Sequence, residues 1–175
     1  MILTASQQLR DYDERSFNER FERLQFLDRL MRRDVRWGMP VLAYHYFQDA
    51  KICFIGGAPA ATVVMCQMVA EEVVRAAYRE SGNRKLVKRA GLKELLNKAH
   101  EDRLVSNREF RDLNRLRGIR NPYVHTGNDL GSQITKWMPT DLTTKVDVVR
   151  AERDARTAFK ILVRFLDETS LIMRL

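Results

Sequence analysis

Apolar residues recur every three or four positions along most of the chain, which is the spacing of one face of an α-helix. The first clear run begins at Ser16, where a glutamate three residues later completes a capping-box spacing and predicts a helix start. We expect this helix to end near Trp37 and Gly38. Its apolar stripe consists of Phe17, Phe21, Leu24, Leu27 and Leu30.

Two largely apolar segments follow the first helix. Pro40 suits the first position of a helix, and residues 41–55 predict a second helix that stops at Gly56 and Gly57. Residues 60–81 predict a third helix, which is apolar on nearly all sides in its first half, so we expect it at the centre of the fold. In its amphipathic second half, the residues expected inward are Val69, Val73, Ala76 and Ala77, and those expected outward are Glu72, Arg75 and Arg79.

The C-terminal half predicts three more helices. A short helix covers residues 92–100, and Ser106 and Glu109 repeat the capping-box spacing before the next one. Residues 127–143 predict a long loop, and residues 144–172 predict the closing helix. The residues of the closing helix expected inward are Ala155, Ala158, Leu162, Phe165 and Leu166.

Few helix breakers interrupt this pattern. Glycine and proline together number 12 of 175 residues, and the polar-apolar alternation typical of strands is scarce. We therefore expect an all-α fold, a helical bundle of about five to six helices with an extra N-terminal helix. Residues 1–38 are expected to form an N-terminal amphipathic helical extension, and residues 40–175 the bundle.

Targeting and metal-binding signals are missing from the sequence. The longest apolar stretch, residues 58–70, falls short of the roughly 20 residues that span a bilayer. No basic region precedes an apolar block at the N-terminus, so we expect a cytoplasmic protein without a membrane partner. Cys53 and Cys66 are typical of reduced core residues, and the scattered cysteines and histidines predict neither a metal nor another cofactor.

The positive charge is concentrated in one part of the chain. The net charge is +8, and residues 84–120 alone hold twelve basic against five acidic side chains. Arginine outnumbers lysine 23 to 8 in the chain, and its planar fork suits bidentate contacts with phosphate. This clustering favours a phosphate-bearing ligand over a merely solvated face. The candidate nucleic-acid-binding residues are Arg84, Lys85, Lys88, Arg89, Arg115 and Arg117.

The end of this basic region carries the candidate chemistry, because Arg120, Asn121 and His125 fall within six positions. Asn121 before Pro122 is a helix-start signal, which puts His125 on the first turn of a new helix whose free N–H groups attract phosphate. The alternative is one continuous helix kinked at Pro122. Both geometries allow the three side chains to share one ligand.

Such a trio can bind and cleave a phosphodiester. In metal-independent RNA cleavage, a base removes the 2′-hydroxyl proton, a cation stabilises the pentavalent phosphorane, and an acid protonates the leaving 5′-oxygen. Histidine suits both proton transfers and arginine the charge, while asparagine orients a phosphate oxygen. Since one histidine cannot easily be both base and acid, we expect a two-fold dimer with two copies of His125 and Arg120 in one cleft. The alternative is that these side chains only cap carbonyl groups at a helix junction.

The segment from Arg120 to His125 resembles the arginine-histidine motif of the HEPN superfamily, in the form with asparagine directly after the arginine. The order of the predicted helices from about Pro40 to Leu175 is also similar to that family's arrangement, with a basic connector before the motif helix. The resemblance implies a metal-independent endoribonuclease without cofactors, acting on RNA as a homodimer with its site at the interface. It also implies a toxin or antiviral effector whose further partner is a cognate antitoxin or a defence-complex protein.

Individual roles follow from the resemblance. Arg120 and His125 match the catalytic pair, and Asn121 matches the polar residue after the arginine. Glu72 is similar in position to an acidic residue that some members keep on the preceding helix, and its other interpretation is a surface pair with Arg75. Tyr123 is a supporting residue that either stacks on a base or packs in the core.

Two other functions remain open from the sequence. One is a non-catalytic helical module that binds nucleic acid, a nucleotide or a partner protein through the same face, and the other is a purely structural dimerisation domain. His45 is interpreted as a bundle histidine and His100 as part of a solvated helix end, so neither competes with His125 for the chemistry.

Overall fold

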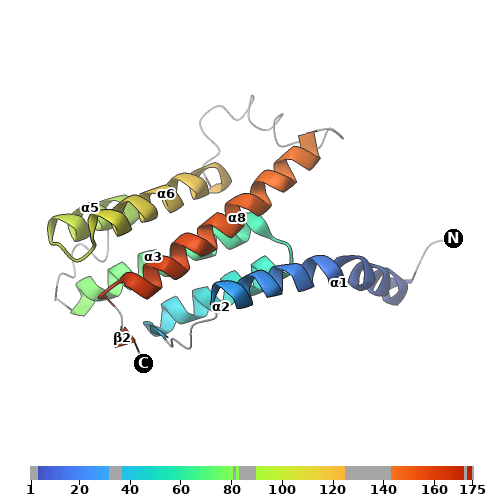
Figure 1. Cartoon of the computed structure of the whole chain (residues 1–175), viewed down its shortest axis with the longest axis horizontal. Coiled ribbons are helices and arrows are strands. Elements are labelled where there is room, and N and C mark those ends of the chain that lie inside the picture. The colour runs from blue at the N-terminus through green and yellow to red at the C-terminus, as the bar shows by residue number, and fades with distance from the viewer. Residues whose placement is uncertain are drawn as a thin grey trace.

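The computed structural model describes residues 4–31, 37–80, 82, 90–124, 143–171 and 173–174. In this part of the chain there are six helices, α1 (Ala5–Leu30), α2 (Val41–Ile55), α3 (Pro59–Glu80), α5 (Leu92–Glu101), α6 (Asn107–Val124) and α8 (Thr143–Glu168) (Figure 1). Two short strands, β1 (Trp37–Gly38) and β2 (Met173–Arg174), form an antiparallel pair near the C-terminus. The predicted all-α helical bundle is confirmed.

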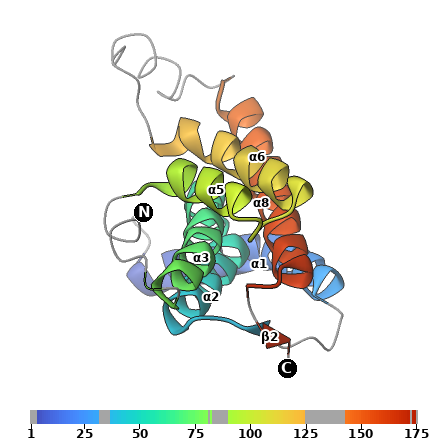
Figure 2. The ribbon, with the colours of Figure 1, turned by 90° about the vertical axis from the view of Figure 1, so that its left-hand side faces the viewer.

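Helix α3 lies at the centre of the bundle, as its apolar first half predicted. It packs against α2, α5, α6 and α8, and the end-on view places the α5 and α6 pair on one side of α3 and α2 on the other (Figure 2). The core continues between α2 and α8, where the rings of Phe54 and Phe159 meet edge to face with centroids 5.2 Å apart. The inward residues predicted for the closing helix are all buried.

Helix α1 begins earlier than the sequence pattern predicted. Thr4 is the N-cap, its hydroxyl accepts from the Gln7 amide at 3.4 Å, and Gln7 Oε1 accepts from the Thr4 amide at 2.9 Å. The predicted helix start at Ser16 is therefore wrong, since Ser16 lies inside α1. The helix ends at Leu30, before the predicted end near Trp37.

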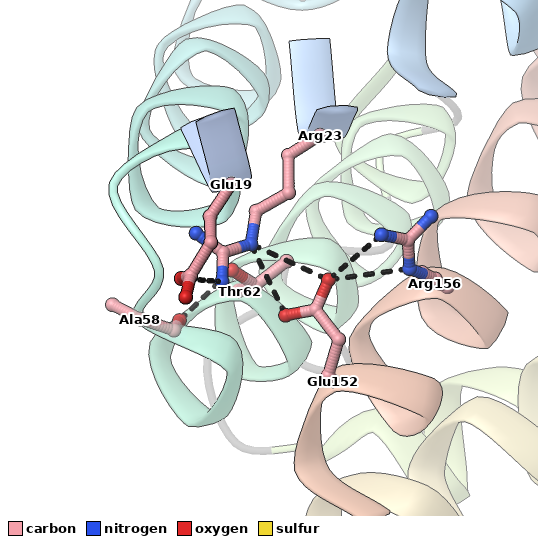
Figure 3. A network of polar contacts seen from close by, with 6 residues as sticks. All are labelled: Glu19, Arg23, Ala58, Thr62, Glu152 and Arg156. Carbon is pink, nitrogen blue, oxygen red and sulfur yellow. Dashed lines mark hydrogen bonds and ion pairs between the residues drawn. The ribbon is translucent and has the colours of Figure 1, made fainter. Parts of the chain in front are cut away.

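The second half of α1 is anchored to the bundle by packing and by a charge network (Figure 3). Leu27 is fully buried, and Phe26 packs on Phe54. Arg23 pairs with Glu19 one turn earlier and with Glu152 of α8 at 3.2 Å, and Glu152 also pairs with Arg156 at 3.1 Å. Because Arg23 and Glu152 come from different helices and are both largely buried, this network fixes α1 against α8.

The remaining helix ends agree closely with the sequence. Pro40 is the N-cap of α2 rather than its first residue, and α2 ends at Ile55 with Gly56 as its C-cap, where the stop was predicted. The capping box before α6 is confirmed, because the Ser106 amide donates to Glu109 Oε2 at 2.6 Å and the Glu109 amide to Ser106 Oγ at 3.2 Å. The predicted loop over residues 127–143 lies outside the described residues except for its last position, which starts α8.

The interior contains neither a disulfide nor a membrane-spanning element among the described residues. Cys53 and Cys66 are both free thiols, as predicted, and burial raises the pKa of the Cys66 thiol. None of the described helices combines the length and the apolar run that crossing a bilayer requires.

Candidate functional site

Arg120 and Asn121 lie on the last turn of α6, which we call the motif turn, and α6 is one continuous helix through Val124 with Pro122 inside it. The predicted helix start at Asn121 and Pro122 is therefore wrong, and the alternative of a continuous helix holds as far as Val124. Proline leaves the carbonyl four residues earlier without its helical donor. That carbonyl belongs to Gly118, and both Gly118 and Pro122 are exposed, so water can satisfy it.

Arg120 lies on the side of α6 that faces the bundle. It follows Leu116 by four residues and Leu113 by seven, and both leucines are fully buried, so the three share one helical face. The Arg120 side chain is half-buried, with its Nε atom shielded from solvent. Asn121 is also half-buried, one position further around the helix. His125 lies outside the described residues.

Tyr123 connects the motif turn to α8. Its ring packs against the hydrophobic core, and its hydroxyl donates to Asp154 Oδ2 at 3.0 Å. Asp154 also lies 3.9 Å from Nε of Arg150. Of the two interpretations of Tyr123 from the sequence, core packing is the one that these contacts support.

The basic residues of α6 point in different directions. Arg111 and Arg115 are exposed on the side away from the core, and within the described part of the chain neither has a carboxylate partner. Arg117 is half-buried, its Nε donating to Asn114 Oδ1 at 3.4 Å, and it lies about 200° around the helix from Arg115. The other predicted nucleic-acid-binding residues, Arg84, Lys85, Lys88 and Arg89, lie outside the described residues.

Glu72 is not the surface residue that the sequence suggested. It is only 5% exposed, and its carboxylate forms an ion pair with Arg79 two turns along α3. The predicted partner Arg75 pairs instead with Glu71, one turn away, and its Nη2 also donates to the Ala90 carbonyl at 3.1 Å. The ion pair with Arg79 offsets the cost of burying the Glu72 carboxylate, so this polar position of the amphipathic pattern can face inward.

The two described histidines lie away from the motif turn. His45 is exposed on α2, which makes its interpretation as a bundle histidine wrong. His100 Nε2 is 2.7 Å from Asn107 Oδ1, and its ring packs on Phe110 at 4.5 Å, so it joins α5 to the start of α6. No cluster of side chains able to hold a metal ion occurs among the described residues.

Two polar contacts at this end of the molecule were missed by sequence reasoning. Asp154 follows Tyr123 by 31 positions, and Glu152 follows Arg23 by 129. No local spacing signals such contacts between distant segments. Arg23 was not among the stripe residues expected from the sequence, although its angle around the helix falls between those of Leu27 and Leu30.

Comparison with known proteins identifies the family. The HEPN domain family model matches residues 42–168, which run from the first turn of α2 to the end of α8 and include the motif turn. No curated protein matches the chain, and no solved structure matches it. Since the match covers more than half of the 175 residues, the chain belongs to the HEPN domain family.

Proposed function

We propose that this protein is a metal-independent endoribonuclease whose active site combines the motif turns of two copies. The observation that carries the proposal is the position of Arg120 and Asn121 together on the last turn of α6, directly before His125, within the matched family region. A half-buried arginine at a helix end is a suitable group for stabilising a phosphorane, because partial removal from water strengthens its field.

The proposed reaction needs no group beyond these side chains. A His125 imidazole accepts the 2′-hydroxyl proton, the 2′-oxygen attacks the adjacent phosphorus, and the bond from phosphorus to the 5′-oxygen breaks. The imidazolium of the second copy gives its proton to the leaving 5′-oxygen. The products are a 2′,3′-cyclic phosphate and a 5′-hydroxyl end, while Arg120 stabilises the charge on phosphorus and Asn121 orients a phosphate oxygen.

The proposed RNA path runs along basic residues that approach the motif. Arg111 and Arg115 give α6 an exposed positive edge, and the connector residues 84–89 supply four further cations. In this proposal, Glu72 supports α3 from within and Tyr123 positions the motif turn through Asp154. The cellular role we propose is that of a toxin or antiviral effector, held in check by a cognate antitoxin or a defence-complex protein.

The proposal is tested with purified protein and total RNA or tRNA in the presence of EDTA. Wild type is expected to produce fragments with 2′,3′-cyclic phosphate ends, and His125→Ala is expected to lose cleavage by at least about 100-fold. His45→Ala is the matched control, since His45 is exposed on α2, and it should cleave like wild type.

Equal cleavage by wild type and His125→Ala would refute the proposed chemistry. Salt-sensitive RNA binding without cleavage by wild type would favour the second candidate, a non-catalytic nucleic-acid-binding module. The observation that favours this second candidate is the exposed pair Arg111 and Arg115, because two exposed guanidinium groups attract phosphate whether or not His125 acts as a catalyst.

A further inference from the structure

The outward side of α6 carries two arginines and then an exposed glycine and an exposed proline. Arg111, Arg115, Gly118 and Pro122 follow one another by four, three and four positions, and all four are exposed. At about 100° per residue they fall within an arc of about 60°, on the side opposite the fully buried Leu113. We call these four residues the outer stripe of α6, and the stripe leads from the exposed arginines to the motif turn.

Gly118 is not required by the packing of the protein. A Cβ added at this position would meet neither a neighbouring side chain nor the backbone of another segment within 4 Å, and its φ does not lie in the left-handed region. Glycine weakens a helix interior relative to alanine, and one of its uses is to let a ligand approach the backbone closely. Because no described neighbour occupies the space over Gly118, that space is open to a ligand.

Pro122 frees a hydrogen-bond acceptor at the same place. Proline has no backbone N–H, so the Gly118 carbonyl lacks the helical donor that residue 122 would otherwise supply. Since glycine consists of backbone alone, the exposure of Gly118 is exposure of its backbone atoms. The outer stripe therefore presents a backbone acceptor one turn after the Arg115 guanidinium.

The two kinds of group on this stripe fit a single strand of RNA. Guanidinium groups bind phosphate oxygens, and those oxygens only accept hydrogen bonds. The backbone group of RNA that donates a hydrogen bond is the ribose 2′-hydroxyl, which DNA lacks. Arg115 and Gly118 lie on one face of α6, about 4.5 Å apart along the axis, so a phosphate and the ribose beside it can reach both residues.

We propose that the Gly118 carbonyl, freed by Pro122, accepts a hydrogen bond from an RNA 2′-hydroxyl and so selects ribose over deoxyribose beside the motif turn. Arg115 holds the adjacent phosphate. This inference rests on the proposed function, because it takes RNA as the ligand of α6. The contact is one of binding and moves no proton, so it acts whether or not His125 is present.

The test measures the affinity for one single-stranded oligonucleotide sequence in two forms, RNA and its 2′-fluoro analogue, by fluorescence anisotropy. The 2′-fluoro form keeps the ribose pucker of RNA but has no 2′-hydroxyl to donate. Every protein in the series carries His125→Ala, so that cleavage does not disturb the measurement. The parent of the series is expected to bind RNA about three- to tenfold more tightly than the 2′-fluoro form, which corresponds to one net hydrogen bond.

The deciding variant is Pro122→Ala, which restores the N–H at position 122 and returns the Gly118 carbonyl to the helix. The ratio of the two affinities should fall close to one, while the affinity for the 2′-fluoro form should stay at the parent value. Alanine suits a helix interior better than proline, so this variant should fold at least as stably as its parent. Pro59→Ala is the matched control, because Pro59 is the first residue of α3, where a missing N–H costs no helical bond, and it should keep the parent ratio.

A second variant, Gly118→Leu, fills the open space over the carbonyl. It should also bring the ratio close to one, whereas Ala60→Leu adds the same side chain at an exposed position of α3 and should keep the parent ratio. The inference is overturned if the parent binds both forms equally or if Pro122→Ala keeps the parent ratio. It is also overturned if the effect of Pro122→Ala follows the base sequence and not the 2′-group, since the donor would then be a base.

These outcomes are separate from those of the cleavage test. If wild type cleaves RNA and His125→Ala does not, the proposed function stands even where Pro122→Ala leaves the ratio unchanged. If wild type fails to cleave RNA but Pro122→Ala abolishes the preference for ribose, the contact at Gly118 stands and the proposed chemistry fails.

Discussion

The hydroxyl of Tyr123 and the carboxylate of Asp154 form a 3.0 Å hydrogen bond that joins the last turn of α6 to α8. Two residues before Asp154, Glu152 receives the guanidinium of Arg23 from α1. Side chains two positions apart on a helix point about 200° apart, so α8 is held on opposite sides by the motif helix and by α1. The motif turn and the N-terminal helix are thus both positioned by the same stretch of α8.

The first prediction concerns the bond between Tyr123 and Asp154. Tyr123→Phe keeps the packed ring and removes the donor, so the free energy of unfolding should fall by about 0.5–1.5 kcal/mol. Asp154→Ala removes the acceptor, and a double-mutant cycle by urea denaturation should give a coupling of about 1 kcal/mol. Tyr44→Phe is the control, because Tyr44 is exposed on α2. Additive losses in the cycle would mean that the bond does not stabilise the fold.

The second prediction compares two glycines with the same backbone conformation. Gly57 has φ +79° and Gly82 has φ +80°, so alanine at either position should cost about 1–2 kcal/mol of backbone strain. An added Cβ at Gly57 would also lie 2.9 Å from Arg23 Nη1, whereas at Gly82 it meets nothing within 4 Å. Arg23 cannot move away without disturbing its pairs with Glu19 and Glu152.

We therefore expect Gly57→Ala to lower the midpoint of thermal unfolding clearly more than Gly82→Ala. In an Arg23→Ala background the two glycine substitutions should have similar effects, because the obstructing side chain is gone. Equal effects of the two substitutions in the wild-type background would contradict this account of the network in Figure 3.

Much of the fold could be predicted because local signals and tertiary packing agree. The apolar run of α2, the capping box of Ser106 and Glu109 and the inward stripe of α8 all occur where the sequence pattern predicted them. At each of these places, the local helix signal is followed by residues that bury one face of the same helix in the bundle. Sequence periodicity is reliable where both effects act on the same residues.

The wrong predictions occur where the local helix signal and tertiary packing do not favour the same structure. The first half of α1 has no fully buried residue, so its start at Thr4 has a capping box but no buried stripe to mark it. At Asn121 and Pro122 the local helix-start signal is overridden, because Ile119 and Tyr123 pack on the core and keep α6 continuous. Glu72 is buried and forms an ion pair with Arg79, and helical periodicity alone does not reveal such a pair.

The third prediction is a pH dependence at the end of α5. Hydrogen bonds from Lys98 Nζ at 2.6 Å and from the Tyr78 hydroxyl at 2.9 Å hold the pKa of Asp102 below its usual 3.8. A carboxyl with a lowered folded-state pKa stabilises the fold above its unfolded pKa and loses that contribution as pH falls through the folded value.

Asp102→Asn should therefore lower the free energy of unfolding at pH 7. This loss relative to wild type should shrink below about pH 4. Urea denaturation of both proteins at pH 7, 5 and 3 measures this difference. Asp28→Asn serves as the control, since Asp28 is exposed on α1, and it should show little change at any of these pH values. If the difference in the free energy of unfolding between wild type and Asp102→Asn does not vary with pH, the ionised carboxylate is not its source.

The fourth prediction concerns the exposed arginines of α6. If Arg111 and Arg115 contact RNA phosphates, replacing both by alanine should weaken binding to single-stranded RNA and reduce its salt dependence. Each lost phosphate contact lowers the slope of log affinity against log salt by about 0.7, so the slope should fall by about 1.4. Arg10→Ala with Arg29→Ala removes the same charge from exposed positions on α1 and should leave the slope unchanged, because α1 lies outside the proposed RNA path. Fluorescence anisotropy at several salt concentrations measures both slopes, and a His125→Ala background prevents cleavage during the measurement. Equal slopes for the two double variants would show that the loss of RNA binding comes from net charge rather than from Arg111 and Arg115 themselves.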